Sequence, residues 1–149
     1  MFDIESYHKA DSVDEAISLL LQNPNSIPIA GGTDVLVRLR QGNPDFCHMV
    51  DIHDIVDLKI IEMEPDGTIV VGSGATFTDL IKSSVITENI PVLAQGASSV
   101  GGPQVRNQAT VGGNICNGAP SADGAAPLLV LNTVVELRGP QGIRRIPLH

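Results

Sequence analysis

Residues 110–123 read TVGGNICNGAPSAD and combine paired glycines, short polar side chains and an acidic residue just before an apolar run. Gly112 and Gly113 can adopt backbone angles closed to other residues, and they let a bound molecule approach the main chain. Ser121 or Asp123 is placed to cap a helix in the apolar run that follows. Free amides at a helix start suit a phosphate. The stretch therefore predicts a ligand loop, with a glycine-rich Ω-loop that only closes a turn as the alternative.

A second glycine turn lies near the start of the chain, where the apolar run IPIA at residues 27–30 leads into GGTD at residues 31–34. An amphipathic segment follows at residues 35–40, so the pattern predicts a strand, a glycine turn and a helix. Amides of a helix start would again point at whatever lies above the strand end, and the Thr33 hydroxyl adds a donor. For this turn taken alone, a tight connection without a ligand is the alternative.

Composition indicates a folded globular chain and restricts its ligands. The 149 residues are 42% hydrophobic but only 3% aromatic, so the core must be built from aliphatic side chains. The formal net charge of −8 argues against nucleic acid or an anionic membrane as a partner. A phosphate would then have to be held by backbone amides and hydroxyls. No apolar run approaches a membrane span, and the acidic start MFDIE lacks signal-peptide features, so we expect a cytoplasmic location.

Residues suited to metal binding or acid–base catalysis are sparse. Cys47 and Cys116 are far apart in sequence and form no CxxC pair or Cys/His cluster. This spacing argues against a zinc or iron–sulfur site within the chain and leaves a disulfide open. We assign no catalytic residue and interpret the histidines as surface or packing residues; they are His8, His48, His53 and His149.

Local patterns predict a mixed α+β chain. Ser12 and Glu15 form a capping-box pattern before a packing helix, whose buried face is expected to carry residues 13, 16, 17, 20 and 21. Arg106 is the strong cation nearest to residues 110–123, and we expect it to pair with a carboxylate or cap carbonyls. The other expected elements are strands over 4–8, 27–30 and 46–52, hairpins turning at 64–67 and 138–142, and helices over 78–83, 92–99 and 125–131.

The two glycine stretches together resemble those of the FAD-binding subunits of molybdenum hydroxylases, with xanthine dehydrogenase FAD subunits the most similar. The likeness continues through VDI at 50–52, GSGATF at 72–77 and GPQVRN at 102–107, so it covers essentially the whole chain. It implies an α+β flavin-binding fold of the vanillyl-alcohol-oxidase (PCMH) type. Residues 1–57 would form an N-terminal subdomain, and residues 58–149 a second subdomain that is incomplete at its C-terminus.

The resemblance also implies which residues hold FAD. Residues of both glycine stretches would line the pyrophosphate and the flavin, Val100 would pack near the ring system with Ile115 beside the ring, and Asp123 would bond the ribitol or ribose region. The full implied set is Pro28, Ile29, Ala30, Gly31, Gly32, Thr33, Asp34, Val35, Val100, Ala109, Thr110, Gly112, Gly113, Asn114, Ile115 and Asp123.

In the enzymes that this sequence resembles, electrons leave a molybdenum centre, cross iron–sulfur clusters on a separate subunit and reduce FAD, which passes hydride to NAD. The resemblance therefore implies an oxidoreductase subunit whose partners are a molybdopterin-containing subunit and a 2Fe–2S subunit, with NAD as acceptor. An unpaired sheet edge would also favour a homo-oligomer. One alternative is a truncated, flavin-free assembly piece of such a complex. A reductase of the wider flavin fold, such as a UDP-N-acetylenolpyruvoylglucosamine reductase, fits the GGNICN sequence less well.

Overall fold

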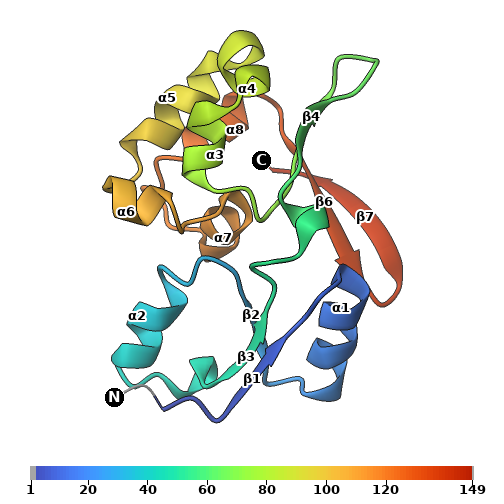
Figure 1. The fold of residues 1–149 in the computed structure, drawn as a ribbon, viewed down its shortest axis with the longest axis vertical. Coiled ribbons are helices and arrows are strands. Elements are labelled where there is room, and N and C mark those ends of the chain that lie inside the picture. The colour runs from blue at the N-terminus through green and yellow to red at the C-terminus, as the bar shows by residue number, and fades with distance from the viewer. Residues whose placement is uncertain (1–2, 149) are drawn as a thin grey trace.

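The structure is a computed structural model that describes residues 3–148. Its first part, which we call the N-terminal lobe, is built on a three-stranded parallel sheet of β1 (Ser6–Lys9), β3 (His48–Asp51) and β2 (Ile27–Ile29), in that order. Parallel neighbours need crossover connections, so helices separate the strands in sequence. These are α1 (Val13–Gln22) between β1 and β2, and α2 (Val35–Arg40) with the short helix η1 (Pro44–Phe46) between β2 and β3 (Figure 1).

Helix α1 begins where its cap predicts. The Ser12 Oγ accepts a hydrogen bond from the Glu15 amide at 3.2 Å, while the Glu15 carboxylate accepts from the Asp11 amide at 2.8 Å. The predicted face is correct for most positions but wrong for Leu21, which is 60% exposed. Leu19 packs against the sheet core in its place, so the buried face of α1 is rotated toward Leu19 from the predicted one.

The remainder of the chain forms a helical lobe flanked by two hairpins, which lies above the N-terminal lobe in Figure 1. Its largest core cluster gathers Phe77, Leu80, Ile86, Leu93 and Leu128, all nearly inaccessible to solvent. The elements after β3 are η2 (Val56–Leu58), β4 (Ile61–Met63), β5 (Ile69–Val71), α3 (Phe77–Lys82), α4 (Ser84–Asn89), α5 (Pro91–Ser99), α6 (Pro103–Arg106), α7 (Val111–Asn117), α8 (Ala125–Val130), β6 (Val134–Gly139) and β7 (Gly142–Pro147).

Both predicted hairpins are confirmed, since β4 pairs antiparallel with β5 and β6 with β7. The helices expected near α3, α5 and α8 are also confirmed. The predicted cap of α8 is wrong: its N-cap residue is Gly124, and neither Ser121 nor Asp123 caps it with a side chain. Helices α4, α6 and α7 were not predicted: α6 has only four residues, and α7 contains two glycines, which lower helix propensity.

The combination of a parallel sheet, hairpins and packed helices confirms the α+β class. The boundary between subdomains 1–57 and 58–149 remains a prediction. Within residues 3–148, no helix is long and apolar enough to cross a bilayer. Both cysteines are free thiols, Cys47 buried and Cys116 exposed. His8 is exposed, His48 and His53 are half-buried, and His149 lies outside the described residues.

Candidate functional site

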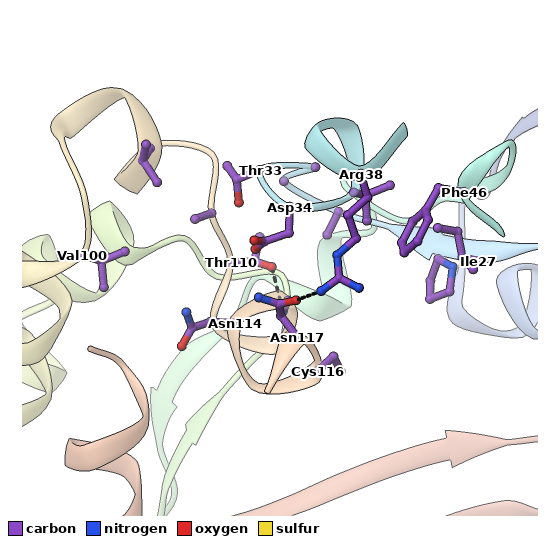
Figure 2. A pocket seen from close by; sticks show the side chains of 18 residues that line it. Ile27, Thr33, Asp34, Arg38, Phe46, Val100, Thr110, Asn114, Cys116 and Asn117 are labelled. Atoms are coloured by element: carbon purple, nitrogen blue, oxygen red, sulfur yellow. Dashed lines mark hydrogen bonds between the residues drawn. The ribbon is translucent and has the colours of Figure 1, made fainter. Parts of the chain in front are cut away.

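A cleft of about 480 Å³ opens where the two lobes meet (Figure 2). The N-terminal lobe contributes the end of β2, the turn at residues 31–34 and helix α2, and the helical lobe contributes Val100 and residues around the start of α7. The cleft thus brings together both glycine stretches. Of the predicted site residues, it is lined by Pro28, Ala30, Gly31, Gly32, Thr33, Asp34, Val35, Val100, Ala109, Thr110, Gly113 and Asn114.

Four predicted site residues lie outside this lining. Ile29 points to the other face of β2, as strand alternation requires, and is buried beside Leu39. Gly112 faces the main chain at Ser73, and a Cβ added to it would lie 2.5 Å from the Ser73 Cβ. The others are Ile115, which packs against the core of the helical lobe, and Asp123, which is exposed before α8. Their contact with a cofactor stays a prediction.

The turn at residues 31–34 carries the free backbone donors of the cleft. Across residues 3–148, no oxygen accepts a hydrogen bond from any of these four amides. Gly32 turns the chain with a φ of +69°, a left-handed angle that a side chain would oppose. Successive backbone amides in such a turn form a concave site that favours an anion. The predicted phosphate-binding property therefore fits this turn.

The start of α7, a helix that the sequence did not predict, offers no free amides to a ligand. The helix start to which the sequence assigned phosphate-binding amides is that of α8, and phosphate binding there stays a prediction. The first three amides of the helix are all used inside the protein. They belong to Val111, Gly112 and Gly113, and their acceptors are the Ala75 oxygen at 3.0 Å, the Ser73 oxygen at 2.8 Å and Thr110 Oγ1 at 3.1 Å. The stretch begins as a capped helix rather than as an Ω-loop, and neither glycine has a left-handed φ.

Main-chain contact brings the two glycine stretches together at Gly31. A Cβ added to Gly31 would lie only 1.8 Å from the backbone oxygen of Gln108, so no residue with a side chain fits in this backbone arrangement. Gln108 directly precedes Ala109 and Thr110, which line the opposite wall of the cleft. Gly31 therefore sets how closely the two walls approach.

A cation also lines the cleft, although the acidic composition predicts that a phosphate is held without one. The Arg38 guanidinium donates from Nη2 to the Asn117 Oδ1 at 2.7 Å, which joins α2 to α7 across the cleft (Figure 2). Its Cζ also lies 5.4 Å from the centre of the Phe46 ring, a cation–π arrangement. Arg38 follows Val35 by three residues, a helical spacing that places both on one face and could have indicated it.

Two further lining residues were not predicted because they lie on α7, a helix that was itself not predicted. Cys116 and Asn117 lie three residues after Gly113 and Asn114, so only the unpredicted helix α7 brings them to the cleft. The remaining missed lining residues are Ile27, Phe46 and Val105.

Arg106 is confirmed as a structural cap rather than a cleft residue. Its Nη1 donates to the backbone oxygens of Ser98 at 3.1 Å, Val100 at 3.1 Å and Gly101 at 2.8 Å. These bonds hold the turn after α5 that carries Val100 to the cleft. The positive charge nearest the predicted ligand loop is thus used to fix the wall.

The chemistry available in the cleft is binding rather than acid–base catalysis. Among the described lining residues, the ionisable side chains are Asp34, Arg38 and Cys116, and no His or second carboxylate accompanies them. Unpaired amides, one guanidinium and apolar walls can hold and orient a ligand that has both a phosphate and an aromatic part. Any redox chemistry must come from that ligand.

Comparison with known proteins identifies the ligand class. The family described as "FAD binding domain in molybdopterin dehydrogenase" matches residues 2–149. The xanthine dehydrogenase FAD-binding subunit of Escherichia coli O157:H7 is 47% identical over the whole chain, which covers 51% of that protein. The carbon monoxide dehydrogenase medium chain of Hydrogenophaga pseudoflava is 37% identical over 95% of this chain and 49% of its own length.

A solved structure agrees with these sequence matches. Carbon monoxide dehydrogenase from Hydrogenophaga pseudoflava superposes with a TM-score of 0.94 at 34% identity, covering 99% of this chain and 52% of that one. The chain thus spans about half the length of the relatives it matches. The agreement extends over both lobes and confirms the predicted flavin-binding fold.

Proposed function

The chain belongs to the family of FAD-binding domains of molybdopterin dehydrogenases, and from this membership we propose that its cleft holds the pyrophosphate of FAD. The observation that carries the proposal is the turn at residues 31–34, whose four amides have no acceptor within residues 3–148 and which lies in one cleft with the Arg38 guanidinium. Backbone amides and a cation are the donors that a diphosphate requires. The acidic chain thus concentrates suitable donors where an anion can reach them.

The remaining lining residues divide by chemistry into two further roles. The Thr33 hydroxyl and the Asn114 amide are polar groups that would orient the ribityl or ribose part of FAD. Val100 and Ala109 offer an apolar surface that would pack near the flavin ring. The flavin itself supplies the uptake and release of electrons. Ile29, Gly112, Ile115 and Asp123 lie outside this lining, and we retain them as predicted contacts at the margin of the site.

We extend the proposal to the electron path of the whole protein. The chain would act within a complex with a molybdopterin-containing subunit and a 2Fe–2S subunit, take electrons from the clusters into FAD and pass them to NAD. Support comes from the xanthine dehydrogenase and carbon monoxide dehydrogenase subunits that the chain resembles. Since the chain spans half of their length, partners and acceptor are tested on the assembled complex, where NADH should bleach the flavin absorption.

Equilibrium binding of FAD to the purified chain tests the cleft itself. We expect a bound flavin with its visible absorption and an Arg38→Gln variant that binds FAD about ten- to a hundredfold more weakly, because hydrogen bonds to charged groups contribute about 1.5–3 kcal/mol. The matched control is Arg40→Gln, on the same helix but outside the described cleft lining, and its affinity should stay near that of the wild type.

Two results would contradict the proposal. Equal loss of affinity in both arginine variants would mean that net charge, rather than the position of Arg38, controls binding. A folded chain that stays colourless after incubation with FAD would favour the flavin-free assembly piece.

A further inference from the structure

A second cluster of ligating side chains lies outside the cleft, where β1 and β3 of the parallel sheet begin. Glu5, Cys47 and His48 each offer one ligand atom, and these atoms all lie within 4.8 Å of one another. None of the three lines the cleft. We infer that this Glu–Cys–His cluster is a binding site for a divalent zinc ion.

The backbone explains how neighbouring residues can share one site. Successive side chains on a strand point to opposite faces, which would separate Cys47 from His48. Cys47, however, ends the short helix η1 with φ −84° and ψ −15°, and β3 begins only at His48. Glu5 is held beside them because its amide donates to the Cys47 backbone oxygen at 2.9 Å, just before β1 pairs with β3.

The second nitrogen of the His48 ring is already engaged. The Nδ1 of His48 lies 2.9 Å from the Ser6 Oγ, whereas its Nε2 lies 3.5 Å from the Glu5 Oε2. In the tautomer whose Nδ1–H donates to the Ser6 Oγ, the Nε2 lone pair faces a carboxylate oxygen, and a cation bound between these two acceptors would satisfy both. A metal-bound histidine usually donates its other ring N–H in this way, which fixes the ring orientation.

The ligand types favour zinc over the alkaline-earth ions. A thiolate and an imidazole suit Zn²⁺, while Mg²⁺ and Ca²⁺ prefer sites made only of oxygen atoms. The Cys47 thiol is buried, but the side chain of His48 is 24% exposed and that of Glu5 69% exposed. The ion would therefore have three protein ligands and a fourth position open to water. Binding replaces the thiol proton, which is released to solvent.

The ion would join the first strand to the core of the N-terminal lobe. Cys47 packs in one cluster with Ile29, Leu39 and Met49, the side chains beneath β2 and α2. Zinc bound here would stabilise the lobe that carries the turn at residues 31–34 without entering the cleft. The competing explanation is a simple ion pair between His48 and Glu5, which requires neither a metal nor Cys47.

Direct metal titration of the chain separates the two explanations. With Zn²⁺ alone in competition with a chromophoric chelator, we expect one equivalent to bind and the thermal midpoint of unfolding to rise. With Co²⁺ in its place, we expect a thiolate-to-metal charge-transfer band. His48→Gln and Cys47→Ser should each weaken zinc binding by more than tenfold, and Ser6→Ala by about ten- to a hundredfold, as removal of an orienting partner does.

Three further variants keep the test independent of folding. Cys47 is buried, so its loss can destabilise the lobe, whereas Glu5 is exposed and Glu5→Gln should lower zinc affinity in a folded protein. The matched controls are Cys116→Ser and His8→Gln, which remove the same chemical groups elsewhere and should bind zinc as the wild type does. Absence of bound zinc at micromolar concentration, or unchanged affinity in Glu5→Gln and His48→Gln, would overturn the inference.

Discussion

Replacing Gly31 by alanine adds a single methyl group at a point where the main chains of the two cleft walls meet. The new Cβ would lie 1.8 Å from the Gln108 backbone oxygen, whereas ordinary van der Waals contact begins at 3.4 Å. The main-chain segments at Gly31 and Gln108 must therefore separate by about 1.6 Å. The obstacle is main chain, and it cannot turn aside as the end of a flexible side chain can. The turn at residues 31–34 must therefore move relative to the opposite wall.

The displacement sets the size of both expected effects. A hydrogen bond with a donor–acceptor distance near 2.9 Å breaks when that distance grows by about 1.6 Å. At least one amide of the turn would therefore lose its hydrogen bond to the phosphate. One such charge-assisted bond contributes about 1.5–3 kcal/mol, which predicts FAD binding that is about ten- to a hundredfold weaker. Overpacking itself costs about 1–3 kcal/mol, which lowers the midpoint of thermal unfolding by about 2–12 °C.

Titration of FAD into the variant, with thermal unfolding measured on the same samples, tests both effects. Gly72→Ala is the control for stability, because its Cβ would lie 2.2 Å from the Leu58 oxygen, away from the cleft. It should unfold earlier yet bind FAD normally while folded. Gly139→Ala meets nothing within 4 Å and should change neither quantity. If Gly31→Ala binds FAD as tightly as Gly139→Ala does, the close approach at Gly31 does not shape the site.

Two further predictions concern single side chains. Tyr7 is the one tyrosine of the sequence, and its hydroxyl donates a hydrogen bond to the Asp51 carboxylate. This bond raises the pKa of the phenol above its ordinary value near 10. Ultraviolet titration of the phenol should show a lower midpoint in Asp51→Asn than in the wild type. Because the folded-state pKa of Tyr7 is raised, its contribution to stability is complete at neutral pH and is lost as pH rises through that pKa. Thr110→Ala removes the cap of α7 and should lower the free energy of unfolding by about 1 kcal/mol. Thr110→Ser should retain most of that stability in chemical denaturation, and equal stability of the two variants would show that the cap contributes nothing.

Local signals in the sequence were sufficient for most elements. The cap at Ser12 and the turn residues of both hairpins depend on neighbours within a few positions, and each was predicted correctly. Long-range features were not accessible in this way. The amides of Val111 and Gly112, at the start of α7, donate to the backbone oxygens of Ala75 and Ser73, which are far away in sequence, so no local pattern could show these contacts.

The same distinction divides the candidate site. The glycine turn at residues 31–34 could be recognised because its residue types are local. The helical spacing from Val35 could indicate that Arg38 faces the cleft, but its hydrogen bond to Asn117, 79 residues later, could not be predicted from local sequence. The cluster of Glu5, Cys47 and His48 escaped the spacing argument against a metal site, because pairing of β1 with β3 assembles its ligands.

The contact between Gly31 and Gln108 places unequal demands on its two residues. Gly31 meets a backbone oxygen, which every amino acid carries, while the Gln108 side chain is exposed to solvent. Position 108 can therefore accept many residue types without altering the contact, but any side chain at position 31 must displace the opposing main chain. Substitutions at the two positions need not be correlated, so a method that infers proximity from paired changes in sequence would overlook this contact between the walls of the cleft.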